Sequence, residues 1–109
     1  MAFDSGLANR LRAALDGQAG LTEKNMFGGL AFLLRGNMCC GVYGEDMIVR
    51  VRPDRHEKLL SKPGAKPFVM GGRRGSKGWL MVEDEGLRGD ALDGWIEEGV
   101  TFALSLPPK

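Results

Sequence analysis

The chain has 109 residues, a length that fills one hydrophobic core and leaves little for a second. Fifteen Lys and Arg against 14 Asp and Glu give a formal net charge of +1, which excludes the strong overall basicity of a dedicated nucleic-acid-binding protein. With 43% hydrophobic and 27% charged residues the composition is that of a folded protein, which excludes extensive disorder. We therefore expect a single domain over residues 1–109.

The first helix is predicted over residues 5–16, because leucines recur there every four positions. These leucines are Leu7, Leu11 and Leu15. Asp4 or Ser5 is expected to cap the N-terminus of this helix, and the glycines at positions 17 and 20 are expected to end it.

Three strands are predicted next, over residues 27–35, 38–43 and 47–52. The first two are separated by Gly36-Asn37, which is the spacing of a two-residue hairpin. In the third strand, side chains alternate between two faces. One face is expected to carry Met47, Val49 and Val51, and the other Ile48, Arg50 and Arg52. The short connections predict antiparallel pairing.

The rest of the chain predicts a helix, two strands and a final helix. Asp54 and Glu57 form a candidate capping box for a short helix that ends near Leu60. Strands are expected over residues 68–70 and 79–82, joined by the glycine-rich, basic connection 71–78. Asp90 is expected to cap the last helix. Its inner stripe would be Leu92, Trp95, Ile96, Gly99, Val100 and Ala103, with Asp93, Glu97 and Glu98 facing water.

The predicted order, α-βββ-α-ββ-α, is typical of an α+β domain with an antiparallel sheet and helices packed on it in two layers. Residues 1–12 lack the basic start and apolar core of a secretory signal, and the longest nearly apolar run, residues 26–34, is far short of the roughly 20 residues that span a bilayer. The two cysteines, Cys39 and Cys40, are adjacent, and a disulfide between neighbours is strained. We expect a cytoplasmic protein with free thiols and no membrane contact.

Several short segments in one order resemble the N-terminal domain of the TfoX/Sxy competence regulators. They are Met26-Phe27-Gly28-Gly29, residues 37–42, residues 62–67, Lys77-Gly78-Trp79 and residues 105–108. The resemblance implies a bacterial cytoplasmic protein with a secretion-chaperone-like fold. It also implies a role in transcription regulation, because full-length members act with a cyclic-AMP receptor protein on DNA-uptake genes. The sequence stops at Lys109 without a second domain, so we expect a stand-alone N-terminal domain. The resemblance supplies no catalytic residues.

The motifs of common catalytic and cofactor sites fail one by one. The sole histidine, His56, begins a His-Glu-x-x pattern, but Leu60 stands where a zincin needs its second histidine. Adjacent Cys39 and Cys40 are expected on opposite faces of a strand, so they would not share a metal with His56. The 17 glycines form no Gly-x-Gly-x-x-Gly and no Walker loop. We expect no metal, no cofactor, no small-molecule substrate and no catalysis, with a cysteine enzyme as the remotest alternative.

Charge is unevenly distributed along the chain. Residues 50–77 hold nine Lys and Arg against two acids, whereas residues 79–109 hold seven acids against two basic residues. A basic surface would form if two arginines of the third strand shared a face with the connection 71–78, and it could contact an acidic protein or phosphates. The candidate partner- or nucleic-acid-binding residues are Arg50, Arg52, Arg73, Arg74 and Lys77.

Two functions follow from these observations. The leading hypothesis is a non-enzymatic regulatory or protein-interaction module that works through protein contacts or self-association. The alternative is a weak nucleic-acid-binding protein that uses the basic segment 50–77. Few aromatic residues lie near this segment, which disfavours a base-stacking platform.

Overall fold

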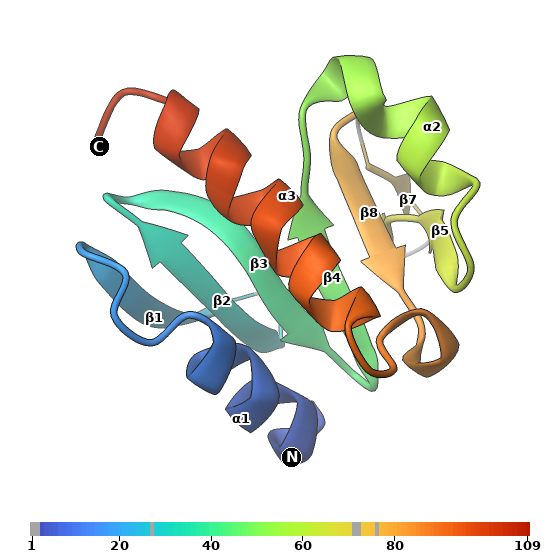
Figure 1. Cartoon of the computed structure of the whole chain (residues 1–109), viewed down its shortest axis with the longest axis horizontal. Coiled ribbons are helices and arrows are strands. Elements are labelled where there is room, and N and C mark those ends of the chain that lie inside the picture. The colour runs from blue at the N-terminus through green and yellow to red at the C-terminus, as the bar shows by residue number, and fades with distance from the viewer. Residues whose placement is uncertain (1–2, 27, 71–72, 76) are drawn as a thin grey trace.

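A six-stranded antiparallel sheet carries all three helices on one face (Figure 1). The computed structural model describes residues 3–26, 28–70, 73–75 and 77–109, with the backbone alone for Met70, Arg73 and Arg74. Across the sheet the strands are β1 (Leu21–Met26), β2 (Gly29–Leu34), β3 (Asn37–Tyr43), β4 (Asp46–Arg50), β8 (Trp79–Val82) and β5 (Ala65–Pro67). The helices are α1 (Ser5–Ala14), α2 (His56–Leu60) and α3 (Ala91–Ser105), with 3-10 turns η1 (Pro53–Arg55) and η2 (Asp84–Gly86). The predicted α+β class and antiparallel sheet are confirmed.

Both long helices bury the faces that their sequence periodicity predicted. In α1, Leu7 and Leu11 are buried, and the Oδ1 of Asp4 accepts hydrogen bonds from the N–H groups of two first-turn residues at 2.8 and 3.2 Å. In α3 the buried residues include Trp95, which is 1% exposed, and Gly99. Asp90 occupies the N-cap position of α3, although its side chain makes no capping hydrogen bond.

The helix that follows β4 begins differently from its prediction. The chain enters a 3-10 turn at Pro53 before α2, and no side chain caps either element. Asp54 lies inside that turn, and its carboxylate contacts Arg52. The predicted capping box of Asp54 and Glu57 is therefore wrong, because proline at the first helical position starts the turn one residue before Asp54.

Strand pairing departs from the sequence prediction in three places. β1 was not predicted, because residues 22–26 of this edge strand are all exposed and show no apolar alternation. β5 was also missed; it pairs with β8 at the opposite edge. The predicted connection 71–78 also contains a strand, because β6 (Val69–Met70) pairs with β7 (Arg73–Arg74) in a separate two-stranded sheet.

The β2–β3 hairpin turns one residue earlier than predicted. Arg35 and Gly36, with φ values of 54° and 86°, form the turn, as in the type I′ geometry that matches strand twist. Asn37 therefore belongs to β3, where it is 1% exposed and donates from Nδ2 to the carbonyl of Pro107 at 2.9 Å. The backbone N–H of Lys109 donates to the carbonyl of Arg35 at 2.8 Å. These two bonds attach the C-terminal residues to the hairpin.

Each face of the sheet carries its own apolar cluster. The larger cluster joins the helices to the sheet and contains Leu11, Phe32 and Trp95. The smaller cluster lies on the helix-free face around Ile48 and Met81, and four partly buried hydrophobic residues pack against it. These residues are Leu33 and the aromatic Tyr43, Phe68 and Trp79. The helix-free face is therefore apolar at its centre and partly accessible at its margin.

Candidate functional site

The most distinctive polar group at the end of the sheet is the guanidinium of Arg50. Arg50 is the last residue of β4 and lies opposite Trp79, the first residue of β8. Its Cζ is 5.2 Å from the ring centroid of Trp79 and 5.1 Å from that of Phe102 on α3. A cation at such distances is attracted to the face of each ring. Two rings from different elements therefore hold one partly buried arginine at the end of the sheet.

The N–H groups of Arg50 make no hydrogen bond or ion pair within the described part of the chain. Arg12 and Arg88 differ in this respect, because Arg12 pairs with Glu23 and Arg88 pairs with Asp84. A guanidinium has five N–H donors in a planar fork that matches carboxylate or phosphate oxygens. Arg50 thus combines a fixed position with unused donors.

The remaining predicted binding residues have different surroundings. Arg52 donates to both carboxylate oxygens of Asp54, at 3.1 and 3.0 Å, so an internal acid neutralises its charge. Lys77 is exposed in the turn that precedes β8. Arg73 and Arg74 form β7, and their side chains lie outside the described atoms. Of the predicted surface, the structure therefore places Arg50 and Lys77 as charged groups without an internal acidic partner in the described part.

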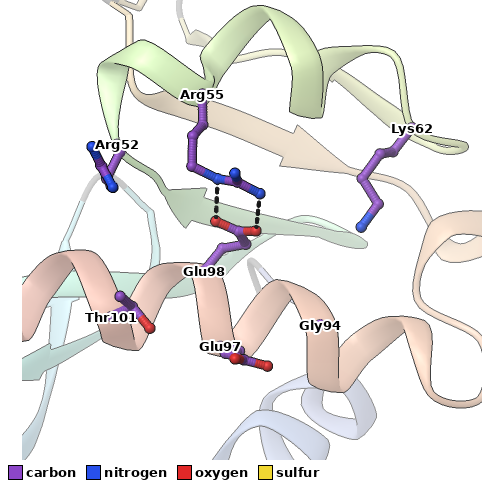
Figure 2. A pocket seen from close by; sticks show the side chains of 7 residues that line it. All are labelled: Arg52, Arg55, Lys62, Gly94, Glu97, Glu98 and Thr101. Atoms are coloured by element: carbon purple, nitrogen blue, oxygen red, sulfur yellow. Dashed lines mark hydrogen bonds and ion pairs between the residues drawn. The ribbon is translucent and has the colours of Figure 1, made fainter.

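Arg52 also lines a groove of about 360 Å³ between α3 and the segment formed by η1 and α2 (Figure 2). Arg55 crosses the middle of this groove and donates to both carboxylate oxygens of Glu98 at 3.0 and 2.7 Å. These bonds raise the pKa of the Arg55 guanidinium. At one end Lys62 places its Nζ 5.0 Å from the ring centroid of Trp95. Positive groups of one wall thus meet negative or aromatic groups of the other.

Glu98 was predicted to face water, and this prediction is wrong. Its side chain is 22% exposed because the Arg55 side chain covers it. The two residues are 43 positions apart in sequence, so helical periodicity alone could not reveal their contact. The groove is an ion-paired seam that holds η1 and α2 against α3.

A second groove, of about 620 Å³, lies at the other end of β4 and is acidic. The Nζ of Lys66 contacts Glu83 at 2.9 Å and Asp46 at 3.0 Å. The hydrogen bonds that Lys66 donates to Glu83 and, second in effect, to Asp46 raise the pKa of its ammonium group. Since β4 begins at Asp46 and ends at Arg50, the strand has an acidic groove at its start and, at its end, a cation with no acidic partner among the described residues.

His56 is buried and has a structural contact. Its Nδ1 accepts a hydrogen bond from the backbone N–H of Gly78 at 2.9 Å. Gly78 has a φ of 97°, and its own carbonyl accepts from the N–H of Val51. His56 therefore helps to fix the turn that delivers Trp79 to Arg50. Within the described ranges, no group of three His, Cys, Asp or Glu residues is arranged to hold a metal ion.

Cys39 and Cys40 were predicted on opposite faces of their strand, and this prediction is wrong. The β2–β3 register shifts so that Phe32 pairs with Cys40 and Leu33 pairs with Met38, which leaves Cys39 as the extra residue of a β-bulge. Both thiols therefore enter the helix-side core, with their Sγ atoms 3.8 Å apart. Cys39 also donates to the carbonyl of Phe32 at 3.4 Å. The hydrogen bond with Cys39, together with burial, raises the pKa of the Cys40 thiol.

Sequence reasoning selected Arg50 but missed its aromatic environment. Neither Trp79 nor Phe102 was a predicted neighbour of Arg50. Antiparallel pairing of β4 with β8 brings Trp79 beside Arg50, and the docking of α3 brings Phe102 to the same point. Both contacts are long-range, so no local pattern could have revealed them.

The fold and the site define a small α+β domain with an aromatic-flanked arginine at one end of its sheet. A search against protein families matches residues 13–103 to the TfoX N-terminal domain. The chain therefore belongs to the TfoX N-terminal domain family and is a competence-regulator-like domain. Neither the curated proteins nor the solved structures contain a match. No helix in the described part of the chain has both the length and the apolar character needed to cross a bilayer.

Proposed function

We propose that the protein is a non-enzymatic regulatory module that acts by binding another protein at the end of the sheet around Arg50. The observation that carries this proposal is the Arg50 guanidinium, held against Trp79 and Phe102 with its N–H donors unused inside the described chain. Arginine and tryptophan are enriched among the residues that dominate binding energy at protein interfaces. Family membership supports a regulatory role in the bacterial cytoplasm, in keeping with the competence regulators.

A weak nucleic-acid-binding function is the second candidate. Five cations that each release a counterion would give a log–log salt slope of about −4 to −5. Because Asp54 already neutralises Arg52, four cations remain at most, and the slope falls to about −3.6. We expect no duplex binding tighter than about 10⁻⁴ to 10⁻⁶ M at physiological salt, the range of non-specific association.

Affinity purification from the native host tests the proposed function. The wild-type protein is compared with Arg50→Gln and with Arg88→Gln, a matched loss of an exposed arginine that contacts Asp84 on its own segment. We expect at least one protein to be retained by the wild type and by Arg88→Gln and lost from Arg50→Gln. The purified partner should then bind directly with the same dependence on Arg50.

The same three proteins are titrated with random and promoter DNA by fluorescence anisotropy. If every protein captured by the wild type is also captured by Arg50→Gln, the proposed docking site is wrong. Sub-micromolar, sequence-dependent DNA binding that Arg50→Gln abolishes would favour the second candidate instead.

A further inference from the structure

We propose that Arg50 binds the side-chain carboxylate of a Glu or Asp residue in an acidic segment of the partner, with apolar residues of that segment beside Trp79 and Phe102. This inference rests on the proposed function and specifies the chemistry of the partner. The juxtaposition that supports it is a planar cation between two aromatic rings, at the margin of an apolar sheet face.

The geometry of Arg50 favours a planar, two-oxygen acceptor. The two rings restrict the orientation of the guanidinium, so less side-chain freedom is lost when a ligand binds. The N–H fork of arginine forms two parallel hydrogen bonds to a carboxylate, an arrangement already present within this protein between Arg55 and Glu98. Among the described residues Arg50 has no such acidic partner, so an external carboxylate can complete the same pairing.

The surroundings of Arg50 favour an acidic protein segment over a phosphate backbone. A phosphate backbone gains affinity from several cations in a row, but the nearby Arg52 is already paired with Asp54. In the neighbouring groove Arg55 is likewise paired with Glu98, and the exposed Glu97 offsets the charge of Lys62, so the groove adds no row of unpaired cations. A single carboxylate flanked by apolar side chains needs no such row.

Apolar contact surface lies directly beside the cation. Trp79 is partly exposed and packs at a centroid distance of 6.0 Å from Phe68, so two aromatic rings continue from Arg50 along the helix-free face. Aromatic side chains offer large apolar area at low conformational cost, which suits protein interfaces. The partner segment is therefore expected to alternate acidic and apolar residues rather than to be uniformly acidic.

The test uses two short synthetic peptides that differ in one atom group: acetyl-Leu-Glu-Phe-Leu-amide and acetyl-Leu-Gln-Phe-Leu-amide. Binding to the ¹⁵N-labelled full chain is followed by NMR through the Arg50 Nε–Hε and Trp79 indole N–H signals. We expect saturable shifts of both signals with the Glu peptide. The Gln peptide cannot form the charge-assisted hydrogen bonds, so its affinity should be lower by about tenfold or more.

Variants separate the charge of Arg50 from its shape. The Arg50→Gln variant should bind the Glu peptide with an affinity lower by about tenfold or more. Arg50→Lys keeps the charge without the planar fork and should bind more weakly than the wild type and more tightly than Arg50→Gln. Arg88→Gln should bind as the wild type does. Near-ultraviolet circular dichroism checks that each variant is folded, and if Arg50→Gln is unfolded, the Arg50→Lys comparison decides.

Equal binding of the two peptides, or equal binding by wild type and Arg50→Lys, would overturn the carboxylate assignment. Inorganic phosphate or a short duplex that shifts the Arg50 signal at lower concentration than the Glu peptide would overturn it in favour of phosphate. The two proposals can fail separately. If an Arg50-dependent partner is captured and the Glu peptide does not discriminate, only the carboxylate chemistry is wrong; if the peptide discriminates and no partner is captured, only the proposed function is wrong.

Discussion

Alanine substitution at two glycines of α3 should change the stability of the protein in opposite directions. Gly99 packs directly on the cysteine bulge: a Cβ added there would overlap the carbonyl oxygen of Cys39 and approach its carbonyl carbon to 3.2 Å. Gly94 lies one and a half turns earlier, and a Cβ added there would meet nothing within 4 Å. Gly94→Ala and Gly99→Ala therefore form a matched pair, because both replace a helix-interior glycine and only one disturbs packing.

The magnitudes follow from two terms. Replacing a helix-interior glycine with alanine stabilises a helix by about 0.5–1 kcal/mol, and this gain applies to both variants. Overpacking a close contact costs about 1–3 kcal/mol, and this cost applies at Gly99 alone, where the overlapped atom is backbone and cannot rotate away. We expect Gly94→Ala to be more stable than the wild type by about 0.5–1 kcal/mol. Gly99→Ala should be less stable than the wild type by up to about 2.5 kcal/mol, the overpacking cost minus the helix gain.

Thermal and chemical denaturation measure both effects. For a domain of this size, 1 kcal/mol corresponds to a shift of about 4–8 °C in Tm, so the two variants should melt on opposite sides of the wild type. Unchanged denaturant m-values would show that the native and denatured states have kept their compactness. Equal Tm values for the two variants would refute the claim that the helix touches the bulge at Gly99.

Three further predictions follow from burial and charge. Trp95→Ala should lower the free energy of unfolding by about 3–5 kcal/mol in denaturant titrations, because it removes the largest fully buried side chain. Cys39 and Cys40 should be alkylated by iodoacetamide much more slowly in the folded than in the denatured protein, as measured by mass spectrometry, because both are buried. The hydrogen bond from Arg12 lowers the pKa of Glu23, so its NMR titration midpoint should lie below the ordinary glutamate value of about 4.3, and Arg12→Gln should raise it.

The sign of the Glu23 effect on stability follows from its lowered pKa. The contribution of the Arg12–Glu23 pair is present above the unfolded pKa of Glu23 and is lost as the pH falls through the folded pKa. It should stay below about 1 kcal/mol, because both side chains are more than a third exposed or close to it. Arg88→Gln serves as the control and should leave the Glu23 midpoint unchanged.

Each of the three predictions has a contrary outcome. A loss below about 1 kcal/mol for Trp95→Ala would mean that α3 contributes little to the core. Rapid, stoichiometric labelling of the folded protein would show that the thiols are accessible and would revive the cysteine-enzyme alternative. An unchanged Glu23 midpoint in Arg12→Gln would mean that the ion pair between α1 and β1 is not formed in solution.

The sequence by itself determined the helices, the local hairpins and the class of the fold. Leu7 and Leu11 recur at helical spacing, and so do the inner residues of α3, because a helix that packs on a sheet must bury one stripe. Short connections between apolar runs dictated antiparallel pairing of β2, β3 and β4, since parallel strands need long crossovers. Arg50 stood out because it is a basic residue on the partly polar face of an alternating strand.

Only the tertiary structure decided which distant groups meet. The polar edge strand β1 is held by its pairing with β2, because its own residues bury almost nothing. One bulge residue places the side chains of Cys39 and Cys40 in the same core, because an extra residue reverses the alternation of a strand. The aromatic environment of Arg50 depends on strand register and on the docking of α3. Such contacts join residues far apart in the chain, and their geometry is set by the packing of the whole domain rather than by any local pattern.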